Sequence, residues 1–121
     1  MTYSVRHHID PRAVVITPMG DLDADAAAVL RHELMTAAEH GGHVIVDLHG
    51  VHLIDSPALG LLVRAHQRTR EQHGTFALVA PSRFVRTVLH TMRLDTAFTT
   101  YDDLDTALGA RVEVTAQRWS L

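Results

Sequence analysis

The sequence contains no cysteine and no lysine, and only 5% of its residues are aromatic. Without cysteine, the chain has no disulfides, thiolate metal sites or cysteine nucleophiles. Because 46% of the residues are nevertheless hydrophobic, the core has to be built from Val, Leu, Ile, Ala and Met. No apolar run approaches the length of a membrane span, and the start of the chain lacks the apolar centre of a signal peptide. We therefore expect a cytoplasmic protein that does not associate with a membrane.

Charge and length indicate which partners and how many domains to expect. The formal net charge of −3 does not favour a nucleic-acid partner. A length of 121 residues fits one domain. The sequence has no repeat, low-complexity run or linker, so we predict a single domain over residues 1–121, with a core at about 3–110 and a C-terminal tail at 111–121.

Strand and helix patterns alternate along the chain. β-branched or apolar runs predict strands at 3–8, 13–17, 43–48, 76–80 and 97–101. Helical spacing predicts a first helix capped by Asp23 or Asp25, a second from Pro57 to about His73, and a third after Ser82. Aspartates at 102 and 103 can cap a last short helix. This alternation predicts an α/β domain with a mainly parallel sheet.

Two of these strands should be central. Residues 44–48 and 76–80 are almost continuously apolar, which is typical of strands covered on both faces. The second predicted helix connects them, so we expect them to be parallel neighbours. In the third helix, Phe84, Val88 and Leu89 recur at helical spacing.

The junction HLIDSPALGLL, residues 52–62, places Ser56 between two apolar runs. The simplest interpretation is structural: Ser56 caps the second helix and Pro57 is its first residue. The same position also exposes a hydroxyl just past the carboxyl end of a strand, where ligands and partners of open α/β sheets bind. A phosphate added there would be tolerated by the helix, but its charge beside Asp55 would repel a partner.

The sequence gives less support to a metal-binding or enzymatic function. The ten histidines are dispersed and form no metal-binding motif, and no cofactor is expected. They are His7, His8, His32, His40, His43, His49, His52, His66, His73 and His90. A hydrolase based on Ser56 would need a nucleophile elbow, which I-D-S-P-A is not. A glycine-rich phosphate loop is also missing, so we do not expect an enzyme. Arg64, Arg68 and Arg70 are interpreted as a solvated helix face that is also able to meet an acidic partner.

The order of these motifs resembles the STAS domain of the anti-sigma factor antagonist family. The similarity extends over roughly residues 3–110, from G-D-L-D at 20–23 through V-D-L, I-D-S-x-x-L-G-L-L and P-S-x-x-V to the acidic D-D-L-D segment. The resemblance implies a four- to five-stranded sheet with helices mostly on one face. It also implies binding to an anti-sigma factor that is a serine kinase, release of a sigma factor, and resetting by a phosphatase.

The resemblance assigns roles to individual residues. Ser56 matches the phosphorylated serine of the family motif D-S-x-G-L-G. The partner-binding positions that it implies are Asp21, Asp23, Asp55, Ser56, Pro57, Ala58, Leu59 and Gly60. The chain departs from the family where Pro57 replaces a small polar residue and Ala58 replaces glycine. The alternative hypothesis is a STAS interaction module without phosphorylation, acting as a subunit of a transporter or signalling complex.

Overall fold

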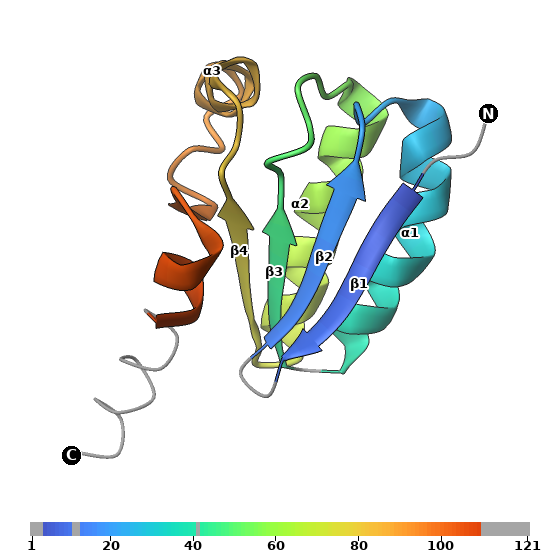
Figure 1. Ribbon diagram of the computed structural model, residues 1–121, viewed down its shortest axis with the longest axis vertical. Coiled ribbons are helices and arrows are strands. Elements are labelled where there is room, and N and C mark those ends of the chain that lie inside the picture. Colours follow the sequence, from blue (N-terminus) through green and yellow to red (C-terminus); the bar gives the residue numbers. More distant parts are fainter. Residues whose placement is uncertain (1–3, 11–12, 41, 110–121) are drawn as a thin grey trace.

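The computed structural model describes residues 4–10, 13–40 and 42–109 and shows one five-stranded sheet with strand order β1-β2-β3-β4-β5 (Figure 1). Tyr3 and the predicted tail at 111–121 lie outside the described residues. The strands are β1 Ser4–Asp10, β2 Ala13–Met19, β3 His43–Asp47, β4 Thr75–Val79 and β5 Thr99–Tyr101. The helices are α1 Ala24–Glu39, α2 Ser56–Glu71 and α3 Arg83–Thr91, and residues 104–109 are also helical.

The sheet is parallel except at one edge. β1 pairs antiparallel with β2, whereas β2, β3, β4 and β5 run parallel to one another. β3 and β4 are paired from His43 and Thr75 to Asp47 and Val79, with Val44 and Val46 at most 1% exposed. The prediction of two central parallel strands is therefore confirmed, and the α/β fold class with it.

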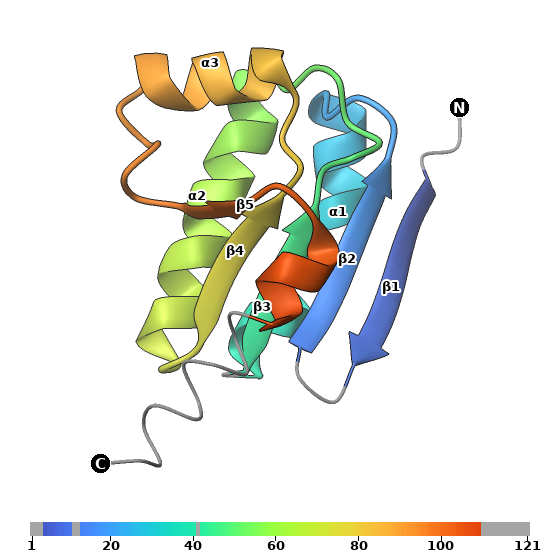
Figure 2. The same ribbon diagram turned by 60° about the vertical axis from the view of Figure 1, so that its left-hand side comes forward.

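Each face of the sheet packs against a different part of the chain. Val44 and Val46 point into the larger core, which α1 and α2 cover. Ile45 points to the opposite face, where it packs with Ala107 and Leu108 of the 104–109 helix. Figure 2 shows that short helix in front of the sheet, with α1 and α2 behind it. The longer helices thus lie on one face, as predicted, and a single short helix covers part of the other.

The sequence patterns were less accurate at element boundaries. β2 continues through Pro18 to Met19, beyond the predicted end at Thr17, because it stays paired with β1 up to Met19. It pairs with β3 only over residues 14–16. Pro18 therefore does not have to donate a hydrogen bond to β3. The predicted strand at 97–101 is shorter, since only Thr99–Tyr101 pairs with β4.

The apolar residues of α3 do not all face the core. Phe84 is 44% exposed, while Val85 is fully buried and Leu89 is 2% exposed. α3 presents Val85 and Leu89, four residues apart, to the core, and this rotation places Phe84 at the surface.

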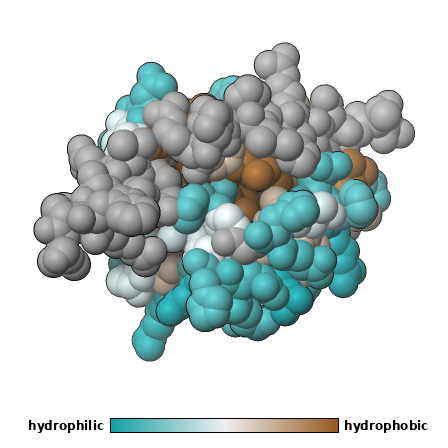
Figure 3. Space-filling model, turned by 90° about the horizontal axis from the view of Figure 1, so that it is seen from below, coloured by the Kyte–Doolittle hydropathy of each residue, from teal (hydrophilic) through white to brown (hydrophobic). Residues whose placement is uncertain are grey.

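The candidate site lies where β2, β3 and β4 end. These carboxyl ends meet at the upper end of the sheet in Figure 1, close to the start of α2 and to α3. The opposite end, seen from below in Figure 3, is mostly hydrophilic over its coloured surface, and hydrophobic residues show near the centre of the view. Within the described residues, no helix has the length and apolar character that crossing a membrane requires.

Candidate functional site

Two loops at this end of the sheet are held side by side by main-chain hydrogen bonds. The N–H of Leu22 donates to the carbonyl of Leu53 at 2.9 Å, and the N–H of Asp55 donates to the carbonyl of Leu22 at 2.9 Å. Leu22 and Ile54 form an isolated parallel bridge. The predicted residues Asp21 and Asp23 are therefore brought next to the segment that leads into Ser56.

Asp21 fixes the backbone of the second loop. One oxygen of its carboxylate accepts hydrogen bonds from the N–H groups of Leu53 at 3.0 Å and His52 at 3.3 Å. Asp23 caps α1 by accepting from the N–H of Ala26 at 2.8 Å. Both aspartates are exposed, yet both have a structural task in positioning this end of the molecule.

The cap of α2 is Asp55, which corrects the prediction that Ser56 has this role. The carboxylate of Asp55 accepts from the N–H of Ala58 at 3.0 Å, and its carbonyl accepts from the N–H of Leu59 at 2.9 Å. Ser56 is then the first helical residue and Pro57 the second. Proline is compatible with this position because first-turn N–H groups have no partner within the helix.

Because Asp55 caps α2, the Ser56 hydroxyl has no capping role. Ser56 is exposed, and its side chain forms no hydrogen bond with any residue that the structure describes. Pro57 is also exposed, whereas Ala58 is fully buried and Leu59 is 6% exposed. The methyl group of Ala58 consequently points into the core and does not cover the surface around Ser56.

An open groove lies between the first turns of α2 and the last turn of α3. Its volume is about 620 Å³. Apolar side chains form most of its walls: Ile54, Leu59, Val63, Val88, Met92 and Leu94. Asp55, Ser56 and Arg64 are its polar lining, and Gly60 leaves part of the α2 wall without a side chain. Ser56 thus stands at the border of an apolar surface that has the shape to accept side chains of a partner.

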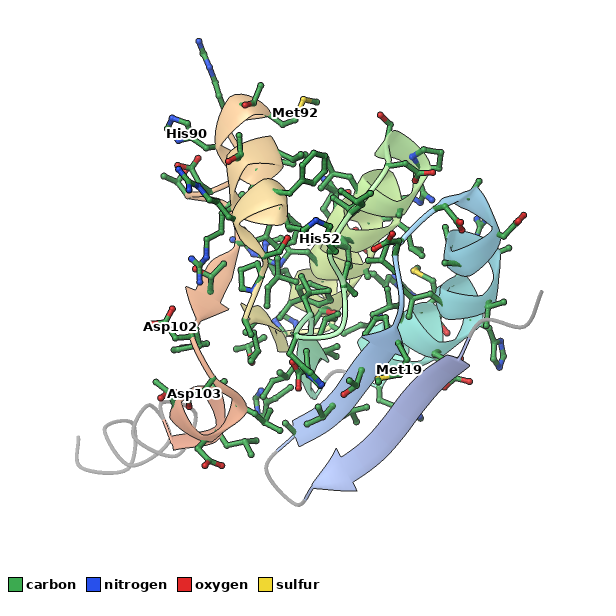
Figure 4. All side chains as sticks on the ribbon, turned by 45° about the horizontal axis from the view of Figure 1, so that its top comes forward. Met19, His52, His90, Met92, Asp102 and Asp103 are labelled. Carbon is green, nitrogen blue, oxygen red and sulfur yellow. The ribbon has the colours of Figure 1, made fainter. Side chains whose placement is uncertain are left out.

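Ser82 ties α3 to the loop that precedes α2. Its hydroxyl accepts from the N–H of Val85 at 3.1 Å, which caps α3, and donates to the carbonyl of His52 at 2.9 Å. Figure 4 shows His52 on this loop and Met92 at the far end of α3. Met92 is 59% exposed, so α3 brings one exposed apolar side chain to the groove.

Sequence reasoning did not find the α3 side of the groove. The sequence showed only the helical spacing of Val88, and Met92 and Leu94 were not considered. The available signal was the apolar spacing of Val88 and Met92, which lie four residues apart and therefore on one side of the helix. Arg64 was interpreted as part of a solvated face, but it also lines the groove.

Two of the described histidines lie beside a carboxylate. His49 lies 2.9 Å from the carboxylate of Asp47, and His90 lies 3.0 Å from that of Asp95. Within residues 4–10, 13–40 and 42–109, no three histidine or acidic side chains are placed to hold a metal ion. Ser56 also has no hydrogen bond to a histidine there, the contact that activates a serine nucleophile.

His66 is the histidine whose surroundings differ most from water. Its ring packs against Phe76 and Phe98, with ring centroids 5.6 Å and 5.1 Å away, and these two rings also contact each other. Its Nδ1 is buried and forms no hydrogen bond with a described residue. Burial lowers the pKa of His66 below its ordinary value of 6.5, and the positive charge of Arg70 lowers it further. This residue belongs to the core beneath the site.

Comparison with known proteins identifies the family to which this fold belongs. The sequence profile of the STAS domain matches residues 4–107, so the chain belongs to the STAS domain family. Comparison with curated protein sequences gives no match. The chain also resembles anti-sigma factor antagonists among solved structures.

Three of these structures show the extent of the likeness. A protein of Thermotoga maritima, described provisionally as an anti-sigma factor antagonist, is 26% identical, with a TM-score of 0.81 over 88% of this chain and 92% of that one. An anti-sigma factor antagonist (STAS) domain protein of Planctomyces limnophilus is 25% identical, with a TM-score of 0.79 over 89% and 97%. The Bacillus cell fate determinant SpoIIAA in its phosphorylated form is 22% identical, with a TM-score of 0.71 over 90% and 98%, and supports the fold alone.

Proposed function

We propose that this protein is an anti-sigma factor antagonist controlled by phosphorylation of Ser56. In its unmodified form it binds an anti-sigma factor that is also a serine kinase, and a sigma factor is thereby released. The observation that carries the proposal is the exposed, uncommitted hydroxyl of Ser56 beside an apolar groove on a STAS fold. The protein acts through binding, needs no cofactor and, with this partner, works in the cytoplasm.

Phosphorylation is a simple displacement at Ser56. Its hydroxyl oxygen attacks the γ-phosphorus of ATP, the bond from that phosphorus to the β–γ bridging oxygen breaks, and ADP leaves. The hydroxyl proton passes to a base of the kinase. A phosphatase reverses the modification by directing water to the phosphorus, which releases inorganic phosphate and restores the hydroxyl.

The added phosphate would change binding more than folding. Near pH 7 it carries close to two negative charges, and the first turn of α2 tolerates them because a helix N-terminus is electrically positive. At an interface the same charges would be desolvated beside Asp55, which is itself only half-buried. A partner seated in the groove would therefore be repelled.

The two departures from the family motif are compatible with this role. Pro57 leaves Ser56 as the single hydroxyl in the first turn of α2. Ala58 fills core space instead of the surface that a kinase has to approach. Asp21 and Asp23 support the loops around the site, and we propose that their exposed carboxylates also face the partner.

The decisive experiment maps the phosphate. The purified chain is incubated with ATP and the anti-sigma factor kinase of the same genome, and the modified peptide is identified by mass spectrometry. We expect modification at Ser56 and not at Ser4, Ser82 or Ser120. Ser82 is the comparison within the same chain, because its hydroxyl already donates one hydrogen bond and accepts another.

Ser56→Ala is the control for this assignment. Modification that persists in Ser56→Ala would contradict the proposal. Binding of the kinase without any phosphate transfer would instead identify a STAS interaction module that is not regulated in this way.

A further inference from the structure

Ser56, Gly60 and Arg64 form one stripe along α2. They are spaced by four residues, which places them above one another on the same side of a helix. All three line the groove described above. Of the groove-lining residues, Arg64 is the one cation and Asp55 the one anion. The charge nearest to Ser56 on its own stripe is therefore positive.

The guanidinium of Arg64 lies over Gly60. Its Nη1 is 3.6 Å from the position that a β-carbon at Gly60 would occupy. The arginine side chain thus runs back along the helix toward Ser56, in the direction that helical side chains favour. Because Gly60 has no side chain, nothing from that residue separates the guanidinium from the Ser56 hydroxyl.

Arg64 is also free to take a new partner. It is exposed and forms no ion pair or hydrogen bond with any residue of the described part of the chain. Its neighbours on the surface differ in this respect. Arg68 pairs with Glu71 at 3.0 Å, and Arg86 pairs with Asp102 at 3.1 Å.

We propose that Arg64 binds the phosphate of phosphorylated Ser56 within the same chain. The proposal rests on the proposed function, since it assigns a receptor to the modification made there. Four residues of helix rise by about 6 Å, a gap that the phosphate and a flexible arginine close from both ends. The planar guanidinium matches two phosphate oxygens, and repulsion from Asp55 directs the phosphate toward Arg64.

The ion pair between the Ser56 phosphate and Arg64 would do more than add negative charge. The phosphate and the guanidinium would lie along the α2 wall of the groove, over the surface that Gly60 leaves open. Phosphorylation would then cover part of the docking surface in addition to repelling the partner. Arg64 is a positioning residue in this scheme and takes no part in phosphoryl transfer.

The test measures the second ionisation of the phosphate. Phosphoserine is incorporated at position 56 during protein synthesis, and its ³¹P NMR shift is followed as a function of pH. A neighbouring cation favours the dianion, so Arg64 should lower this pKa. We expect Arg64→Gln to raise it by roughly half a unit, the scale of a solvent-exposed ion pair.

Arg68→Gln is the matched control, because it removes the same charge one helical turn further from Ser56. It should leave the phosphate pKa close to that of the parent, and Arg64→Lys should restore most of the shift. Equal pKa values in the parent and Arg64→Gln, or equal shifts in Arg64→Gln and Arg68→Gln, would overturn the proposal. No kinase is used, so failure of the kinase assay would refute the proposed function without affecting this measurement.

Discussion

The N–H of Ala58 donates a 3.0 Å hydrogen bond to the carboxylate of Asp55, and this contact starts the helix that carries Ser56. The residue before the proposed phosphorylation site, and not that serine itself, thus holds the first turn together. A serine that also capped its helix would carry the phosphate on the same oxygen that accepts the capping hydrogen bond. Here the cap and the proposed switch are separate side chains, so the switch can change state while the helix stays formed.

Replacing Asp55 by Ala should therefore destabilise the protein by about 1 kcal/mol, the usual cost of losing a helix cap. Ser56→Ala should change the free energy of unfolding by much less, because its hydroxyl has no partner among the described residues. Urea denaturation of both variants, with Asp55→Asn as a cap-retaining control, measures this difference. A larger loss in Ser56→Ala than in Asp55→Ala would restore Ser56 as the cap.

Asp21→Ala should loosen the loop before α2. The variant loses the acceptor of two main-chain hydrogen bonds, from His52 and Leu53, at an expected cost of about 1 kcal/mol. Faster hydrogen exchange at these two amides, measured by NMR, would show the effect locally. Asp25→Ala removes an equally exposed aspartate of α1 and should leave both amides unchanged. If the two variants exchange alike, Asp21 does not hold this loop.

Gly60→Ala should stabilise the protein by roughly 0.5–1 kcal/mol, because glycine inside a helix is less favourable than alanine by that amount. The new β-carbon would meet only the flexible Arg64 side chain, at an ordinary contact distance of 3.6 Å. Gly50→Ala is the contrasting variant, since its β-carbon would lie 3.2 Å from the carbonyl oxygen of Pro18. Thermal melts should show a gain for the first and none for the second.

Acid should destabilise the fold through His66. The pKa of this side chain is lowered in the folded state, so the unfolded chain binds the proton more readily. Its contribution to stability is complete above pH 6.5 and is lost as the pH falls through the lowered pKa of the folded state. His66→Phe, which keeps a ring in contact with Phe76 and Phe98, should flatten the dependence of stability on pH in this range. His32→Gln, at an exposed position, should leave the slope unchanged, and equal slopes in both variants would argue against His66.

Ser56→Asp should weaken the complex with the anti-sigma factor kinase by at least about tenfold, while Ser56→Ala should bind like the parent. The new carboxylate would be desolvated beside Asp55, whereas the helix N-terminus keeps the free protein folded. Calorimetric titration of the partner, together with melts of each variant, separates binding from stability. Ala28→Asp adds the same charge to the exposed surface of α1 and serves as control. Undiminished binding of Ser56→Asp would speak for the unregulated module.

The patterns that predicted the fold were those that depend on burial. Val44 and Val46 stand in an unbroken apolar run, and such a run has few explanations other than a central strand. The location of the site was predictable, because Asp55, Ser56 and Pro57 mark the start of a helix after the end of a strand. The sequence did not predict which of these residues caps α2. Both Asp and Ser are suitable caps, and backbone geometry decides between them.

Residues that face a groove were harder to predict than residues that face the core. Phe84 and Val85 are both apolar, and only the docking angle of α3 decides that Val85 is buried. Arg64 was recognisable as charged but not as a neighbour of Ser56, because its direction depends on the empty position at Gly60. Long-range contacts such as that from Ser82 to His52 leave no signal in a single sequence.

The strand order β1-β2-β3-β4-β5 follows the order of synthesis. No strand has to insert between two that are already paired, so each new strand adds to the free edge left by the previous one. Such a chain can begin to fold while it is still being translated, with α1 and α2 docking as they emerge. The groove beside Ser56 is complete only when α3 has been synthesised, so a partially synthesised chain would compete poorly for the proposed partner.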